Sequence, residues 1–75
     1  MASYTTADKT AVNTNDEIIR TQREILIGTG DLAAKKTAYV TANAASKTNQ
    51  VIHGKYGNVY KTWEEVGYFQ NLLVS

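Results

Sequence analysis

The stretch from Leu32 to His53 contains neither glycine nor proline, and alanine, the best helix former, recurs throughout it. Its spacing places a row of mostly small side chains on one face of a helix, continuing through Asn49: Ala34, Ala38, Ala42, Ala45 and Ile52. This alanine row lets another helix approach closely but offers little apolar area. We therefore predict a long helix with the alanine row as a helix–helix interface. A break near residues 46–49 is the alternative, because Thr and Asn are weak helix formers.

A helix is also predicted over residues 15–27. In the sequence TNDE, Thr14 precedes Glu17 by three residues, the spacing of a capping box at a helix N-terminus. Apolar residues then recur at helical spacing, and Gly28 is suited to a left-handed residue that ends the helix. The adjoining apolar residues near 24–28 also fit a short strand, which stays open as an alternative.

The sequence TWEE predicts a third helix in the C-terminal part of the chain. Thr62 precedes Glu65 by three residues, a second capping-box spacing. One apolar face follows at steps of three and four: Trp63, Val66, Phe69, Leu72 and Leu73. Gly67 falls inside this helix, at a cost of about 1 kcal/mol.

These patterns predict a mainly α fold, a small bundle or extended arrangement of about three helices. Residues 1–13 show no repeating apolar face, so we expect a flexible arm followed by a single small helical domain over residues 14–75. A chain of 75 residues is marginal in stability, because it buries only about 60% of its unfolded surface. It has no cysteine and one histidine, so disulfides and the familiar multi-histidine metal sites are excluded. Of the usual means by which small domains gain stability, oligomerisation or docking on a partner remains.

The charge balance argues against a dedicated nucleic-acid binder, since the net charge is only +1. Residues 31–55 carry four lysines against one aspartate, and both flanking parts are mildly acidic. No basic start with an apolar run marks a signal peptide, and no run approaches the ~20 residues of a membrane span. We expect a soluble protein with no membrane partner, in the cytoplasm or in a particle; the compartment is not indicated.

The decapeptide GKYGNVYKTW, residues 54–63, is the part most like a binding site. It loosely matches the RNA-recognition signature, but a glycine and one stacking aromatic are missing. Together with the lysines of the long helix it gives a candidate aromatic and basic surface: Lys35, Lys36, Lys55, Tyr56, Tyr60 and Trp63. The simpler interpretation is a turn, with glycines at its bends, Asn58 tolerating left-handed geometry and tyrosines covering the end of the core.

Catalytic chemistry has little support in the sequence. His53 has no orienting carboxylate or nucleophile that the spacing identifies. The acidic pairs are consecutive residues in helical caps, so their side chains diverge. Residues 30–37 imitate a phosphate-binding loop without its second glycine. We therefore predict no enzyme activity, no cofactor and no metal.

The leading hypothesis is a non-catalytic structural or assembly subunit that completes its core against copies of itself or a larger complex. A virion or another multi-subunit particle is a natural setting for such short chains. The alternative is a small nucleic-acid-binding regulator that uses the lysine and tyrosine surface.

Overall fold

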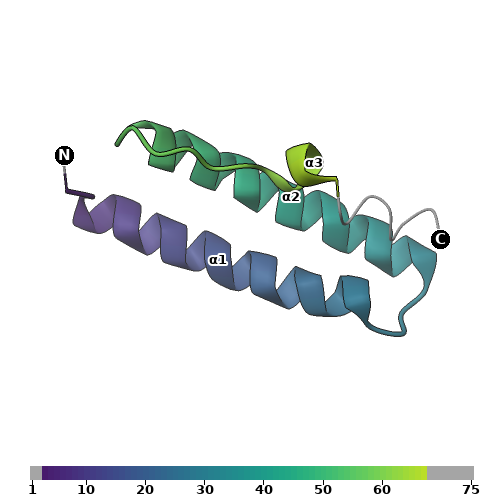
Figure 1. The fold of residues 1–75 in the computed structure, drawn as a ribbon. Coiled ribbons are helices and arrows are strands. Elements are labelled where there is room, and N and C mark those ends of the chain that lie inside the picture. The colour runs from purple at the N-terminus through teal and green to yellow at the C-terminus, as the bar shows by residue number, and fades with distance from the viewer. Residues whose placement is uncertain (1–2, 68–75) are drawn as a thin grey trace.

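The structure is a computed structural model that describes residues 3–67. In this range it contains three helices, α1 (Thr6–Ile27), α2 (Leu32–Gly54) and α3 (Trp63–Val66). The two long helices lie side by side and antiparallel, and the chain after α2 runs back along it to place the short α3 beside α2 (Figure 1). The prediction of a mainly α small bundle is confirmed. Residues 6–27 are helical throughout, so the alternative strand near 24–28 does not form.

Helix α1 begins well before the predicted start at residue 15. Thr5 is its N-cap, and the backbone N–H of Asp8 donates to Thr5 Oγ1 at 3.1 Å. Residues 6–13, which we expected to lie in a flexible arm, are therefore the first turns of the helix. The TNDE sequence that suggested an N-terminus lies inside α1.

The inward-facing side of α1 explains why the apolar pattern missed these turns. The half-buried positions recur at steps of three and four from the first turn onward: Asp8, Ala11, Val12, Asn15, Ile18, Ile19 and Gln22. In the early turns the side chains at these positions are small or polar. The half-buried positions therefore recur regularly along α1, although the residues at these positions are not regularly apolar. The spacing of Thr5 and Asp8, another Ser/Thr-x-x-acid match, was the signal for the true start.

The loop between the long helices is short and corrects one capping prediction. Gly28 ends α1 in an extended conformation with φ −85°, and its N–H donates to the Ile25 carbonyl at 3.2 Å. The left-handed conformation expected there is not adopted. Asp31 is the N-cap of α2, and its carboxylate accepts from the N–H of Ala34 at 2.8 Å. Helix α2 then continues to Gly54 without a break at residues 46–49.

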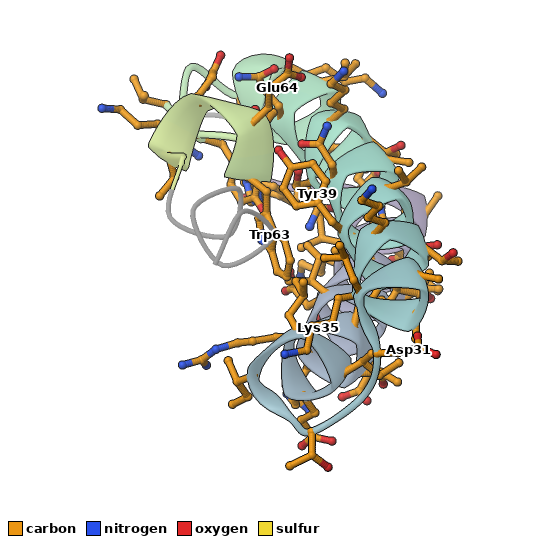
Figure 2. All side chains as sticks on the ribbon, turned by 90° about the vertical axis from the view of Figure 1, so that its right-hand side faces the viewer. Asp31, Lys35, Tyr39, Trp63 and Glu64 are labelled. Atoms are coloured by element: carbon orange, nitrogen blue, oxygen red, sulfur yellow. The ribbon has the colours of Figure 1, made fainter. Side chains whose placement is uncertain are left out.

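The core lies where the three helices meet. Leu26 of α1, Ala38 and Ala42 of α2, and Trp63 of α3 form one buried cluster. Trp63 points from α3 toward the long helices with Tyr39 of α2 beside it, their ring centroids 6.4 Å apart (Figure 2). Small alanines on α2 leave room for the indole ring and the leucine side chain to meet above them.

Helix α3 has the predicted start but an earlier end. Thr62 and Glu65 form a reciprocal capping box, as their spacing predicted. Gly67 does not lie inside the helix: it ends it in a left-handed conformation with φ 76°. The rest of the expected apolar face, Phe69, Leu72 and Leu73, lies outside the described residues.

Hydrogen bonds from α2 hold the start of α3 in place. The backbone N–H of Trp63 donates to Ser46 Oγ at 3.3 Å, and the N–H of Glu64 donates to Asn43 Oδ1 at 3.1 Å. Two of the free N–H groups at the N-terminus of α3 are satisfied in this way. A four-residue helix, too short to be stable alone, is thereby fixed against its neighbour.

Candidate interaction surfaces

The alanine row lies inside the chain. Ala38, Ala42, Ala45 and Ile52 are buried, while Ala34 at the first turn of α2 is exposed. Ala38 and Ala42 belong to the core cluster formed with α1 and α3. The row is therefore already occupied by the chain's own helices, and a second copy has no access to it.

Asn49 continues the alanine row and makes a polar link across the two long helices. Its side chain is fully buried, its amide donates to Asp16 Oδ1 at 3.0 Å, and its carbonyl oxygen accepts from Asn15 Nδ2 at 3.0 Å. The sequence placed Asn49 on this face but did not reveal its partners, which lie more than thirty residues earlier on α1.

Four aromatic side chains meet where α1 begins and α2 ends. The rings of Tyr4 and Tyr56 stack at 4.0 Å, and those of His53 and Tyr60 stack at 5.1 Å. The Tyr4 hydroxyl lies 2.5 Å from His53 Nδ1 and accepts from Asn58 Nδ2 at 2.7 Å. This aromatic cluster, defined as Tyr4, His53, Tyr56 and Tyr60, ties the N-terminus of the chain to the turn after α2.

Asp8 supplies a negative charge at this end. The Tyr56 hydroxyl donates to its carboxylate, and Lys55 Nζ lies 3.7 Å from Asp8 Oδ1. The hydrogen bond from Tyr56, with a smaller contribution from the charge of Lys55, holds the pKa of Asp8 below its usual value. Both Lys55 and Tyr56 are thus engaged with α1.

The structure does not bring the candidate aromatic and basic surface together. Lys35 and Lys36 lie near the start of α2, whereas Lys55 follows its end, about 30 Å away at the rise of a helix. Tyr56 and Tyr60 belong to the aromatic cluster described above. Trp63 is only 8% exposed.

The turn interpretation of the decapeptide agrees with the structure. Residues 55–57 form a turn directly after α2, and Gly57 adopts a left-handed φ of 78°. We expected Asn58 to tolerate that geometry, but it does not adopt it. In the described range the residues with a positive φ are glycines. Tyr56 and Tyr60 cover this end of the hairpin, as predicted.

Helix α2 also presents to solvent an apolar face that we did not predict from the sequence. We define the outer face of α2 as Ala33, Val40, Ala44 and Val51, all of which are exposed. Val40 is 66% exposed and Val51 65%. The signal was present in the sequence, because intervals of seven, four and seven residues keep side chains on one helix face.

Lys47 borders this outer face and is paired within the chain. Its Nζ lies 3.2 Å from Glu64 Oε2. The hydrogen bond from Lys47, followed by that from Asn43, lowers the pKa of Glu64. The carboxylate of α3 therefore neutralises the lysine nearest the middle of α2.

Residues 3–67 show no sign of a metal site, a pocket or a membrane span. Within them no group of three or more His, Cys, Asp or Glu side chains is arranged to hold a metal ion, and no pocket is detected. None of the helices described combines the length and apolarity needed to cross a bilayer. His53 contacts Tyr4 and Tyr60, so its observed role is to join the aromatic cluster.

Comparison with known proteins adds no relative. No family model, curated protein or solved structure matches the chain.

Proposed function

We propose that this chain is a non-catalytic structural or assembly subunit that acts by associating with copies of itself or with a larger protein complex, such as a virion or another multi-subunit particle. The observation that carries the proposal is the distribution of its large apolar side chains. The buried core of the described residues has only Leu26, Ile52 and Trp63 as large members, with alanines completing it. By contrast, seven large aliphatic residues are exposed: Ile25, Ile27, Leu32, Val40, Val51, Val59 and Val66.

The position of these residues matters more than their number, because single exposed apolar residues are normal on protein surfaces. Ile27 and Leu32 flank the loop between the long helices, and Val40 and Val51 lie on one face of α2. Grouped exposure of this kind marks interaction surfaces. A helical hairpin with so small a core gains stability when a partner covers them.

The nucleic-acid alternative receives less support from the geometry. A binding surface needs its cations and stacking rings on one side of the molecule. Here Lys35 and Lys55 lie at opposite ends of α2, Lys55 pairs with Asp8, and the Trp63 ring is covered.

Light scattering behind size exclusion, over a wide range of protein concentrations, tests the proposal. We expect the mass to rise from that of one chain to a discrete oligomer or a growing polymer. A mass that stays at one chain up to the highest concentration would overturn self-association. Retention on immobilised DNA or RNA that falls steeply with salt would favour the nucleic-acid alternative instead.

A further inference from the structure

We propose that residues 61–67 form a strap that opens and closes over the core as a unit, while the hairpin of α1 and α2 beneath it stays folded. The strap is the segment from Lys61 through α3 to Gly67. When it opens, it uncovers an apolar surface on the hairpin that consists of the side chains packed with Trp63 in the core: Ile19, Leu26, Ala38, Tyr39 and Ala42. This inference goes beyond the proposed function, because it holds or fails whatever partner the chain has.

The polar contacts of the strap all come from one side of α2. Four polar residues at helical spacing form this polar stripe: Asn43, Ser46, Lys47 and Gln50. Asn43 accepts from the N–H of Glu64 at 3.1 Å and donates to its carboxylate at 3.4 Å. Ser46 Oγ accepts from the N–H of Trp63 at 3.3 Å, and Lys47 Nζ lies 3.2 Å from Glu64 Oε2. Gln50 donates to the Glu65 carboxylate at 3.3 Å, so each member of the stripe bonds the strap.

Most of these polar contacts lie at the surface, where water competes with them. The side chains of Lys47 and Glu64 are 58% and 55% exposed, and exposed ion pairs contribute little to stability. The hydrogen bonds that join Asn43 to Glu64 and Gln50 to Glu65 are exposed as well. In the open state water bonds these groups in place of the strap, so each contact adds only a small net stabilisation to the closed state. The polar stripe therefore sets where the strap docks more than how firmly it is held.

Trp63 is the apolar anchor of the strap. Within residues 61–67 it is the one large apolar side chain that is buried, since Val66 is 55% exposed. The indole ring points from α3 toward the long helices and lies beside Tyr39 (Figure 2). The other members of the core cluster come from α1 and α2, so they remain together when the indole leaves.

The hairpin keeps its own contacts when the strap opens. In its middle, Asn49 bonds Asn15 and Asp16 across the two long helices. At its open end, the ring of Tyr4 stacks on that of Tyr56 at 4.0 Å. These links involve no residue of the strap. An element joined to its neighbours by fewer buried contacts than they share with each other opens at a lower free energy than the rest of the fold.

The chain is fixed on one side of Lys61 and internally bonded on the other. Before it, the Tyr60 ring stacks on His53 at 5.1 Å, and the Tyr60 carbonyl accepts from Gln50 Nε2 at 2.9 Å. After it, Thr62 and Glu65 close the capping box within the strap itself. Lys61 is exposed and lies outside the helices. Rotation about its backbone therefore moves the strap away from α2 without disturbing the aromatic cluster.

The first test compares two signals during urea unfolding. The chain has one tryptophan, Trp63, so its fluorescence reports the strap. Far-ultraviolet circular dichroism reports the hairpin, because α1 and α2 hold 22 and 23 helical residues against four in α3. We expect the fluorescence change at a lower urea concentration and with a smaller dependence on urea than the loss of helix. Coincident transitions with equal dependence on urea would overturn the inference, because they would show a single cooperative unit.

The second test weakens the polar stripe and leaves the core intact. Asn43→Ala removes both hydrogen bonds to Glu64, and alanine is the better helix former, so α2 is expected to persist. We expect the equilibrium constant for strap opening, from the fluorescence transition, to rise about tenfold, while the helical transition is not lowered. Thr41→Ala is the matched control: it also puts alanine at a polar position of α2 but removes no hydrogen bond to the strap, so the fluorescence transition should stay early and distinct. Equal fluorescence transitions in Asn43→Ala and Thr41→Ala would show that the stripe does not hold the strap.

Hydrogen exchange of the wild-type chain gives a third test that needs no substitution. The amide N–H of Gly67 donates to the Trp63 carbonyl at 3.0 Å, within the strap, and it should exchange whenever the strap opens. The amides of Ala42 and Ala45, at buried positions of α2, should exchange only when the hairpin unfolds. We therefore expect protection of the Gly67 amide to be lower by about tenfold or more. Equal protection of the three amides would mean that strap and hairpin open together, and the inference would be wrong.

Discussion

Asn49 of α2 and Asp16 of α1 are joined by a 3.0 Å hydrogen bond that starts from a fully buried side chain. Asn15, the residue before Asp16, donates to the other end of the same amide. The apolar contacts between the two long helices, among them Leu26, Ala38 and Ala42, specify little about how far one helix slides along the other. A shift of one turn would leave the Asn49 amide buried without partners. This polar link therefore fixes the register of the hairpin.

Replacing Asn49 with alanine should destabilise the chain by about 1–3 kcal/mol, because two hydrogen bonds are lost and a small void is left. Urea unfolding followed by circular dichroism measures the change. Asn13→Ala, at an exposed position on α1, is the control and should stay within about 0.5 kcal/mol. Equal effects of the two substitutions would show that the link contributes nothing.

Enlarging two alanines of the same row should have different effects on stability, because one is buried and the other is exposed. Ala42 is 0% exposed, so Ala42→Leu forces the helices apart and should cost about 1–3 kcal/mol. Ala34 is exposed, so Ala34→Leu should change the free energy of unfolding by less than about 0.5 kcal/mol. Thermal unfolding of both proteins makes the comparison. If Ala42→Leu were tolerated as well as Ala34→Leu, the packing of α1 on α2 described above would be incorrect.

The N-cap of α2 is Asp31, and Thr29 lies two residues before it in the loop. Asp31→Ala should cost about 1 kcal/mol, because the N–H of Ala34 loses its acceptor. Thr29→Ala should have little effect, since Asp31 and not Thr29 occupies the N-cap. Chemical denaturation of the two variants tests this directly. A larger loss of stability for Thr29→Ala than for Asp31→Ala would show that Thr29, and not Asp31, caps the helix.

Acid should destabilise the aromatic end of the hairpin through Asp8. Its pKa in the folded chain is lowered from an ordinary value of 3.8, chiefly by the hydrogen bond from Tyr56. The stabilisation is therefore present above that ordinary value and is lost as the pH falls through the lower, folded-state pKa. We expect a steeper loss of stability below about pH 4 in the wild type than in Tyr56→Phe.

Urea unfolding at a series of acidic pH values gives the two slopes for this comparison. Tyr60→Phe is the matched control, because it removes a tyrosine hydroxyl from the same cluster without touching the hydrogen bond to Asp8. It should keep the pH dependence of the wild type. If Tyr56→Phe also kept it, Asp8 would not be the group that titrates.

Local sequence chemistry predicted much of the secondary structure. The residues from Leu32 to His53 form a helix because nothing in them interrupts one, and the intrinsic preference of alanine acts within each turn. The cap at Thr62 was likewise evident from a three-residue spacing, since both of its hydrogen bonds close inside four residues.

Features that depend on distant partners were the ones the sequence left undecided. The first turns of α1 have small and polar residues on their inner side, and contacts such as Tyr4 with His53, across 49 residues, hold them against α2. The decapeptide after α2 raised the same difficulty. Its tyrosines suit stacking on a base or on a neighbouring ring equally well, and in the structure Tyr56 stacks on Tyr4 and Tyr60 on His53.

By itself the sequence determined that this chain is mainly helical, where α2 lies and how α3 begins, because helix formation and capping depend on residues within one or two turns. Tertiary structure alone decided which face of α2 is covered. Two rows of similar residues run along that helix, and hydropathy does not distinguish them. The row that packs against Leu26 and Trp63 is buried because those bulky side chains fit over its alanines, and the row with Val40 is left in solvent.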